Sequence, residues 1–311
     1  MGNIWITGCF GFIGNNLFKY LVNDNEHVFG VGRSSTILNI DLAKFVIDNV
    51  TSHSLNKLVK LSGGYPELIY HCAGSGSVGN AQKDPLLDFE STIHSCAILL
   101  DWVRINCPSV RVIISSSAAV YGDKHKGNIL ETDLITPFSV YGYNKFIVES
   151  LCNSYIGNYS LDIVIARLFS VYGEGLNKQL LFDFCTRIKN SDSFATLNLF
   201  GTGDEVRDWI HVTDVIETLI LLGKDKNFKH RIVNVGTGNS NTVKDLISLI
   251  LNVWFEEQHN IKLQFNGQSR LGDPLSLLSD NTLRKSLCKS NDVSLIHGVQ
   301  KYVKWYKANI C

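Results

Sequence analysis

Three glycines at positions 8, 11 and 14 lie in the segment ITGCFGFIG, close to the start of the chain. The apolar run NIWIT (3–7) precedes them, and a segment with helical periodicity follows, from about Phe12 to Val22. A glycine-rich turn between a strand and a helix lets the backbone approach a pyrophosphate, and it points amide N–H groups and the positive helix end at negative charge. The segment therefore predicts a dinucleotide-binding α/β fold rather than an ordinary tight turn.

Short apolar runs alternate with longer helical segments through the first half of the chain. The runs are HVFGV (27–31), LIYHCA (68–73), VRVIISSS (110–117) and LDIVIARLF (161–169). Unbroken runs of Val, Ile and Leu are typical of strands buried on both faces, so we expect a doubly wound parallel sheet of the Rossmann type, covered by helices. The pattern loosens after about residue 170, although RIVNVGTG (231–238) indicates one further strand and turn.

This loosening predicts a second, smaller α/β lobe that is interwoven with the first. We expect residues 1–168 to form the dinucleotide-binding domain, with 207–237 returning to it, and residues 169–206 and 238–311 to form the substrate-binding lobe. A cleanly separate second domain is not expected, because no Pro-rich linker or low-complexity tract divides the chain.

The charge balance and the cysteines restrict the kinds of partner. Lys+Arg and Asp+Glu number 29 each in the 311 residues, so the chain lacks the broad basic field that favours nucleic acid or an anionic membrane. No window approaches the roughly 20 apolar residues of a membrane span. The eight cysteines show neither a CxxC pair nor metal-ligand spacing. We therefore expect a soluble cytoplasmic protein with reduced thiols, no metal site, and no nucleic-acid or membrane partner.

The end of the second apolar run, HVFGVGRSS, bears on the choice of cofactor. A carboxylate at this position accepts hydrogen bonds from the adenine ribose and repels a 2′-phosphate. Here Gly32 leaves space, and Arg33, followed by Ser34, can pair with that phosphate. The residues therefore favour NADP(H). NAD(H) remains possible, because Arg33 could be a solvated loop residue and Asp41 could supply the acid.

Tyr141 and Lys145 lie four residues apart in the helix-compatible stretch SVYGYNKFIVESL, which places them on one helix face. An ammonium group beside a tyrosine stabilises the phenolate, so the tyrosine can act as an acid or base near neutral pH. Alone, such a pair is usually part of a solvated helix surface. The serines 115–117, however, end the run VRVIISSS, where loops of a parallel sheet form the ligand crevice. Together these residues suit hydride transfer at a carbinol or ketone carbon, with the tyrosine handling the proton.

Seven motifs follow one another along the chain: TGCFGFIG (7–14), HCAG (71–74), SSSAAVYG (115–122), YGYNK (141–145), RLFSVYG (167–173), FGTGDEVRDWIHVTD (200–214) and NVGTG (234–238). In this order they resemble the extended short-chain dehydrogenase/reductases that act on nucleotide sugars. The resemblance runs from residue 3 to about residue 280. It is specific for the superfamily, although not for one reaction within it.

The resemblance implies roles for individual residues. It makes Tyr141 the catalytic acid/base, Lys145 its partner and Ser117 the hydroxyl that aligns with the family's Ser or Thr. Besides Tyr141, Lys145, Arg33 and Ser34, the cofactor-binding residues would be Gly8, Gly11, Phe12, Ile13 and Gly14 at the pyrophosphate, Asp41 and Leu42 near the adenine and Ala73 beside the nicotinamide. The substrate-binding residues would be Ser75, Ser117, Ser170, Lys178, Gln179, Arg207 and Arg270, of which the two arginines match ligands of the substrate diphosphate. The resemblance also implies a homodimer formed through the helix that carries Tyr141 and the neighbouring helix.

Departures from the family pattern bear on the reaction. Ala118 and Ala119 stand where the 4,6-dehydratases carry Asp-Glu, and the lack of this acid and base argues against dehydration. A 4-keto reductase or a 4-epimerase remains. Gly32-Arg33 favours the reductase, which consumes NADPH, whereas an epimerase recycles its hydride and retains NAD. Ser170 and Thr92, where the family often has Asn, also depart from the ordinary epimerase.

We therefore expect the NADPH-dependent reduction of a nucleotide-linked 4-keto-6-deoxyhexose, which would yield a deoxysugar donor for a surface polysaccharide such as O-antigen. The alternative is an NAD-dependent nucleotide-sugar 4-epimerase of the UDP-glucose or UDP-GlcNAc type. From a different class, the chain could be a catalytically silent sensing or scaffolding relative. Such relatives typically lack the Tyr or the Lys, and because Tyr141 and Lys145 are both present, the sequence favours an enzyme.

Overall fold

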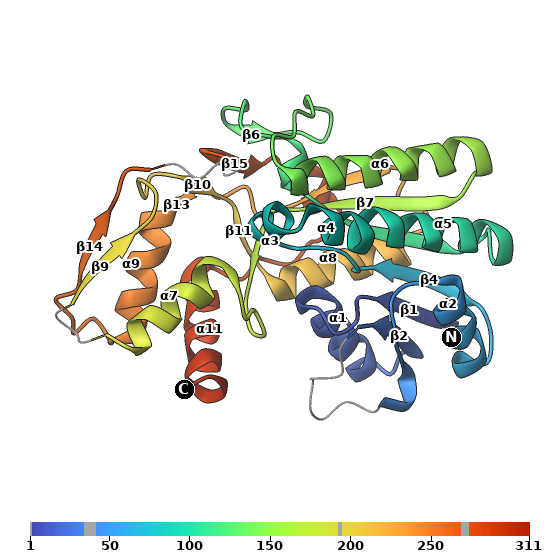
Figure 1. Ribbon diagram of the computed structural model, residues 1–311, viewed down its shortest axis with the longest axis horizontal. Coiled ribbons are helices and arrows are strands. Elements are labelled where there is room, and N and C mark those ends of the chain that lie inside the picture. The colour runs from blue at the N-terminus through green and yellow to red at the C-terminus, as the bar shows by residue number, and fades with distance from the viewer. Residues whose placement is uncertain (1, 34–41, 192–194, 269–273) are drawn as a thin grey trace.

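The computed structural model describes residues 2–33, 42–191, 195–268 and 274–311. Within them, seven strands form one parallel sheet in the order β12-β7-β5-β4-β1-β2-β3 (Figure 1). The strands span Asn3–Thr7 (β1), Val28–Gly32 (β2), Phe45–Ile47 (β3), Pro66–His71 (β4), Arg111–Ser117 (β5), Asp162–Leu168 (β7) and Ile232–Val235 (β12). The order reverses between β1 and β4, and their carboxyl ends border the crevice where a doubly wound sheet binds its ligand. The predicted fold class is confirmed.

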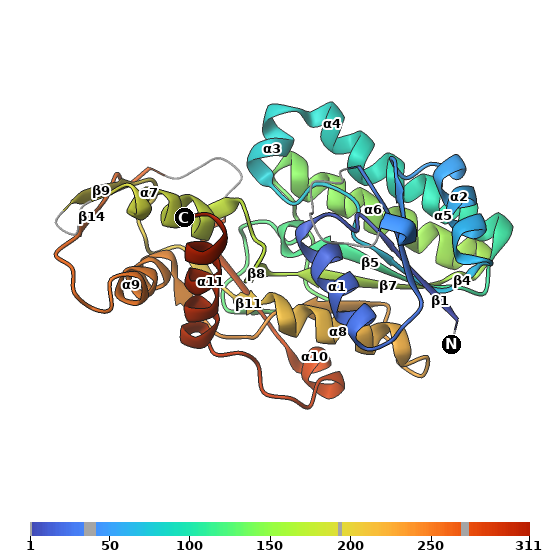
Figure 2. The same ribbon diagram turned by 90° about the horizontal axis from the view of Figure 1, so that it is seen from below.

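Helices cover both faces of this sheet, as Figure 2 shows most clearly. One face carries α2 (Ser52–Ser62), α5 (Ser95–Asn106) and α6 (Val140–Tyr159), and the other carries α1 (Phe12–Asn23) and α8 (Val212–Lys224). Side chains alternate between the two faces along each strand. On β5, Val112 and Ile114 pack with α5 and α6, whereas Ile113 packs with α1 and α8. Burial on both faces explains why the strands read as unbroken apolar runs.

Short helical segments connect the strands near the crevice. They are η1 (Leu42–Lys44), α3 (Val78–Lys83), α4 (Pro85–Phe89), the π-helical turn η2 (Glu90–His94) and η3 (Ala118–Val120). The π turn lies directly between α4 and α5 (Ser95–Asn106). A π turn places one extra residue in the helix and often occurs at functional sites.

A second lobe packs around its own apolar core, at the left in Figure 1. Its helices are α7 (Gln179–Lys189), α9 (Val243–Trp254) and α11 (Leu295–Asn309). Its strands form a β14-β9 pair (Lys262–Phe265, Thr196–Leu199) and a four-stranded sheet in the order β13-β10-β15-β6 (Asn241–Thr242, Val206–Arg207, Ser276–Ser279, Asn128–Ile129). Strand β6 comes from the first half of the chain, so the two lobes are interwoven. The lobe boundaries given above stay a prediction.

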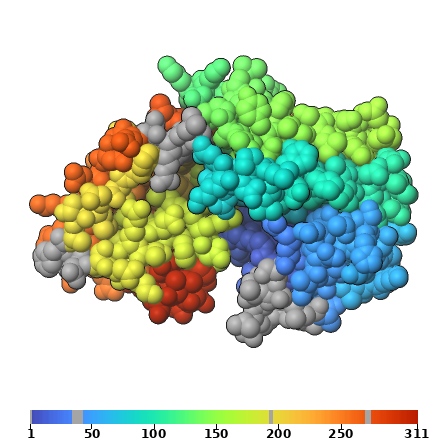
Figure 3. All heavy atoms as spheres, viewed as in Figure 1, coloured from blue at the N-terminus to red at the C-terminus, as the bar shows by residue number. Residues whose placement is uncertain are grey.

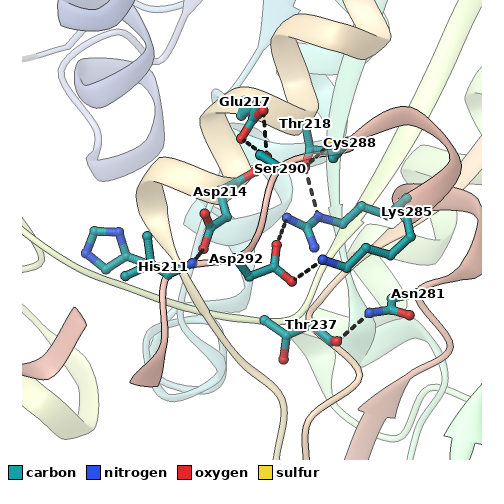
Figure 4. Close-up of polar contacts among 12 residues, drawn as sticks. His211, Asp214, Glu217, Thr218, Thr237, Asn281, Lys285, Cys288, Ser290 and Asp292 are labelled. Atoms are coloured by element: carbon teal, nitrogen blue, oxygen red, sulfur yellow. Dashed lines mark hydrogen bonds and ion pairs between the residues drawn. The ribbon is translucent and has the colours of Figure 1, made fainter. Parts of the chain in front are cut away.

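Three further elements, a pair of strands and a helix, join the lobes. Strand β8 (Ser170–Tyr172) pairs with β11 (Trp209–His211), and α10 (Thr282–Leu287) packs Leu283 and Leu287 against the core below α8. Buried polar contacts hold α10 there (Figure 4). Arg284 donates hydrogen bonds to Thr218 Oγ1 at 3.0 Å and to Asp292 Oδ1 at 2.6 Å. The C-terminal segment is therefore tied directly to the Rossmann helix α8.

Two features are absent from the residues that the structure describes. In that part of the chain, no helix combines the length and apolarity that crossing a membrane requires. The same residues hold no group of three or more His, Cys, Asp or Glu side chains arranged to bind a metal ion.

Candidate active site

The glycine turn adopts the shape that the sequence predicts. Gly8 has a φ of +68°, its amide donates a hydrogen bond of 2.8 Å to the Val31 carbonyl, and Gly11 N–H donates one of 2.9 Å to the Gly8 carbonyl. A Cβ atom added at Gly14 would lie 2.3 Å from the Gly8 oxygen, and one added at Gly8 would lie 2.6 Å from Ala73 N. Both distances are shorter than any real Cβ contact, so this turn requires glycine at positions 8 and 14.

The helix that follows the turn leaves its N-terminal amides available. Gly11 is the N-cap of α1 and carries no capping side chain, and the first turn contains no acidic residue. The amides of the first turn, including Phe12, Ile13 and Gly14, have no partner within the helix. Figure 3 shows a hollow between the two lobes, with the N-terminal residues in dark blue at its floor. The turn and the bare helix end fit the pyrophosphate of a dinucleotide.

The adenine end of this cradle is only partly described. Strand β2 ends at Gly32, where an added Cβ would lie 2.8 Å from the Phe10 ring, and Arg33 is exposed just beyond it. Leu42 begins η1. Ser34 and Asp41 lie outside the described residues. Arg33 therefore lies at the sheet edge where the sequence analysis expects it, and its pairing with a 2′-phosphate stays a prediction.

Helix α6 brings Tyr141 and Lys145 to the end of β5. The Ser139 hydroxyl caps this helix by accepting a hydrogen bond of 3.1 Å from Gly142 N. A Cβ atom at Gly142 would lie 2.6 Å from the Ala119 carbonyl oxygen. Helix α6 therefore approaches the backbone after β5 more closely than any residue other than glycine at position 142 would allow. Gly142, which lies between Tyr141 and Lys145, thus allows α6 to pack closely against the backbone at Ala119.

Lys145 links the helix to the strand. Its side chain is 6% exposed, and Nζ donates a hydrogen bond of 3.0 Å to the Ser115 carbonyl. The same Nζ lies 5.8 Å from the centre of the Tyr141 ring. Ser117 Oγ accepts a hydrogen bond of 3.2 Å from Ala119 N, which leaves the hydroxyl proton free to be donated to a ligand oxygen. The structure therefore places Lys145, with the Tyr141 ring near it, against the carboxyl end of β5, the strand that ends at Ser117.

The loop after β4 borders this group. Ala73 follows the strand, and a Cβ at Gly74 would lie 3.5 Å from Lys145 Nζ. Ser75 N donates a hydrogen bond of 3.0 Å to Thr92 Oγ1. Thr92 is buried in the π turn, and sequence reasoning had noted it only as a departure from the family. The contact that gives it a structural role joins residues 17 apart, which a local pattern does not reveal.

The predicted substrate residues occupy two places. Lys178 and Gln179 begin α7 and face the loop after β4, since Gln179 Nε2 donates a hydrogen bond of 2.6 Å to the Gly76 carbonyl. Arg207 is buried on β10, and Ser170 N donates to the carbonyl of the neighbouring Asp208 at 3.0 Å. Arg270 lies outside the described residues. Helix α7 and the β8–β10 region therefore form the second-lobe side of the crevice.

His211 and Asp214, which belong to the same motif as Arg207, have structural contacts. His211 Nε2 lies 3.0 Å from Glu174 Oε2, and the contact with this imidazole holds the pKa of Glu174 below its usual value. Asp214 accepts a hydrogen bond of 3.1 Å from Val293 N, and burial raises its pKa (Figure 4). These contacts tie the segment that carries Arg207 to Glu174 and Val293.

The model of the NAD dependent epimerase/dehydratase family matches residues 4–236, and the chain belongs to this family. It is 27% identical to the UDP-glucose 4-epimerase of Mycolicibacterium smegmatis, with 97% of each chain covered. Its structure is similar to that of a Thermotoga maritima UDP-glucose 4-epimerase with UDP-glucose, with a TM-score of 0.87, 25% identity, and coverage of 99% of this chain and 100% of the other.

A second solved structure bears on the cofactor. The Bacillus cereus UDP-glucuronic acid 4-epimerase in complex with UDP-glucuronic acid and NAD has a TM-score of 0.85 and 25% identity, and the match covers 98% of this chain and 99% of that one. The predicted membership of the nucleotide-sugar enzymes is confirmed. These relatives do not support the expected 4-keto reductase or the preference for NADP(H), and they agree better with the alternative, an NAD-dependent 4-epimerase.

Proposed function

We propose that this protein is an NAD-dependent 4-epimerase of a UDP-linked hexose. The observation that carries the proposal is the position of Lys145. Its Nζ contacts the Ser115 carbonyl and lies 5.8 Å from the centre of the Tyr141 ring. Both residues lie at the carboxyl edge of the sheet, the same edge at which the glycine turn follows β1. The 4-epimerases among the relatives supply the reaction class. The lack of an acid in η3, where Ala118 and Ala119 stand, agrees with a reaction that eliminates no water.

In this proposal the residues divide the work on the sugar 4-hydroxyl. Tyr141 removes the proton from the 4-oxygen and returns it to the oxygen of the inverted product. The Lys145 ammonium stabilises the tyrosine anion, and the Ser117 hydroxyl donates a hydrogen bond to the reacting oxygen. When bound, the nicotinamide supplies reversible acceptance of the hydride from carbon 4. The acid/base residues are unchanged at the end, as an epimerisation requires.

The remaining proposed contacts follow the two sides of the crevice. Gly8, Gly11, Phe12, Ile13 and Gly14 would hold the cofactor pyrophosphate, and Ala73 would lie beside the nicotinamide. Arg207, with Arg270, would bind the diphosphate of the substrate, where a guanidinium can form paired hydrogen bonds. Ser75, Ser170, Lys178 and Gln179 would line the sugar side.

A homodimer through α6 is part of the proposal. Tyr143, Phe146 and Ile147 are exposed on this helix, and Leu86, Leu87 and Phe89 are exposed on the adjacent α4. Exposed apolar side chains gathered on neighbouring helices mark a surface for association. Sedimentation of the purified protein tests this, and a monomer at micromolar concentration contradicts it.

The reaction itself is tested without added cofactor. Purified protein is mixed with UDP-glucose, or in a second reaction with UDP-GlcNAc, and the sugar product is identified by NMR. We expect the 4-epimer to form and NAD to be released when the protein is denatured. Arg33 is the observation that favours the second candidate, a 4-keto reductase. Stoichiometric oxidation of added NADPH by a 4-keto-6-deoxy sugar nucleotide, with no epimerisation of either hexose, would overturn the proposal in favour of that reductase.

A further inference from the structure

Helix α6 carries a buried carboxylate below the residues proposed to be catalytic. Glu149 lies four residues after Lys145 and eight after Tyr141, so the three side chains share one helix face. Glu149 is 2% exposed. A buried carboxylate is costly unless it is paired and hydrogen-bonded. The hydrogen-bond partners of Glu149 therefore indicate the role of this residue.

Glu149 binds two strands at once. Its Oε2 accepts a hydrogen bond of 2.7 Å from Arg167 Nη2, and its Oε1 accepts one of 3.0 Å from Arg167 Nε and one of 2.6 Å from Ser116 Oγ. Arg167 comes from β7 and Ser116 from β5. The paired guanidinium–carboxylate contact is directional, unlike the apolar packing of Val148 and Cys152 beside it.

The partners of Glu149 are themselves held. Arg167 is 1% exposed and its Nη1 donates to Tyr121 Oη at 2.8 Å and to the Glu131 carbonyl at 3.0 Å. Tyr121 Oη in turn donates to Asn234 Oδ1, on β12, at 2.7 Å. Glu149 is thus anchored to a buried network that spans three strands of the sheet, and it cannot shift without breaking several hydrogen bonds.

Ser116 connects this network to the site. It stands between Ser115, whose carbonyl accepts the hydrogen bond from Lys145 Nζ, and Ser117. Helix α6 and strand β5 are therefore joined at two levels, by Lys145 at the crevice and by Glu149 one helical turn further along. Because Glu149 also pairs with Arg167 on β7, the contacts of α6 lie on two strands rather than along one line, and contacts to two strands resist rotation of the helix about its own axis.

We infer that Glu149 is a positioning residue, which fixes the rotation of α6 on β5 and thereby the placement of Tyr141 and Lys145 relative to Ser117. The inference rests on the proposed function, because it takes these three residues as the reacting group. Arg167 and Ser116 occupy the carboxylate of Glu149, so this role requires no contact with substrate or cofactor.

A pair of substitutions separates positioning from stability. Glu149→Gln alone leaves Arg167 as an unpaired buried charge and can prevent folding. The double variant Glu149→Met/Arg167→Met replaces the ion pair with apolar side chains, a change that is often neutral or stabilising. We expect this double variant to fold and to bind NAD within about threefold of the wild type, while kcat falls about tenfold or more and the pH profile of kcat moves to higher pH.

The matched control is Arg111→Met. Arg111 is buried at the opposite end of β5 and pairs with Asp162 on β7 at 3.2 Å, while Asp162 keeps Arg231 at 2.7 Å. We expect it to lower stability and leave kcat and its pH profile unchanged. A double variant with the wild-type kcat and pH profile would overturn the inference and reduce Glu149 to a stability element.

A second readout does not depend on turnover. Amide hydrogen exchange in the first half of α6 is expected to accelerate about tenfold in the double variant while exchange in α5 stays unchanged. Unchanged exchange in α6 overturns the inference. A wild-type protein that epimerises no UDP-hexose contradicts the proposed function instead, and the exchange result still decides whether Glu149 positions the helix.

Discussion

Gln179 Nε2 donates a hydrogen bond of 2.6 Å to the carbonyl oxygen of Gly76 and so joins the second lobe to the loop after β4. Gln179 has a φ of +68°, a left-handed conformation that is unfavourable for a residue with a side chain. Such a conformation persists where surrounding contacts determine it. This hydrogen bond connects α7, on one side of the crevice, to the loop after β4 on the other side. We call this contact the clasp.

We expect Gln179→Ala to release bound NAD several times faster than the wild type, because the clasp is lost. Gln179→Gly removes the same hydrogen bond but relieves the backbone strain, so it should show the same faster release with a smaller loss of stability. Because oxidised NAD does not fluoresce, the proteins are loaded with NADH, and its dissociation after dilution is followed by its fluorescence. The exposed Gln264 on β14 supplies the control Gln264→Ala, and equal release rates in all four proteins contradict the clasp.

Tyr141→Phe tests the proposed acid/base. Loss of the phenol oxygen removes the group that moves the proton, and general acid–base catalysis contributes about 10²–10⁴-fold to a rate. We expect kcat to fall by this amount while NAD binding, measured by calorimetry, stays nearly unchanged. The control is Tyr143→Phe. Tyr143 lies two residues after Tyr141 on α6 and its side chain is exposed, so this variant should retain activity. Substantial turnover by Tyr141→Phe would remove Tyr141 from the mechanism.

Gly14→Ala tests the cofactor cradle. The new Cβ would lie 2.3 Å from the Gly8 carbonyl oxygen, so the turn must shift. We expect NAD binding to be lost and stability to fall by about 1–3 kcal/mol, as for other overpacked sites. Gly157→Ala is the control, because Gly157 is exposed in α6 with open space around it, and alanine there should stabilise the protein by about 0.5–1 kcal/mol. Normal NAD affinity in Gly14→Ala would contradict the assigned cradle.

Glu174 gives a prediction for pH. The contact with His211 Nε2 at 3.0 Å holds the pKa of this carboxyl below the usual 4.5 in the folded protein. A carboxyl with a lowered folded pKa contributes stability that is complete above the unfolded value and is lost as the pH falls through the folded value. We therefore expect Glu174→Gln to be less stable than the wild type at pH 7, with the difference shrinking below about pH 4.5. Urea unfolding across this range measures it, and two parallel stability curves would refute it.

The sequence alone determined the elements whose causes are local. The glycine turn, the strand before it and the helix from Phe12 follow from residue type and spacing, and VRVIISSS (110–117) appears as β5 (Arg111–Ser117). The spacing of Tyr141 and Lys145 likewise predicted a shared helix face. The prediction of NADP(H) from Arg33 also rested on a local pattern. Ser34 and Asp41, which belong to that pattern, lie outside the described residues. A relative of known structure binds NAD, so the comparisons do not support this prediction.

Only the tertiary structure decided what depends on contacts between distant segments. Strand β6 pairs with β15 across about 150 residues of chain, the π turn sets Thr92 against Ser75, and Glu149 meets Arg167 and Ser116 from two different strands. Glu149 by itself is typical of a solvated helix surface. Its burial is the result of how α6 packs on the sheet, and hydrogen bonds and ion pairs between segments depend on that packing rather than on the spacing of residues along the chain.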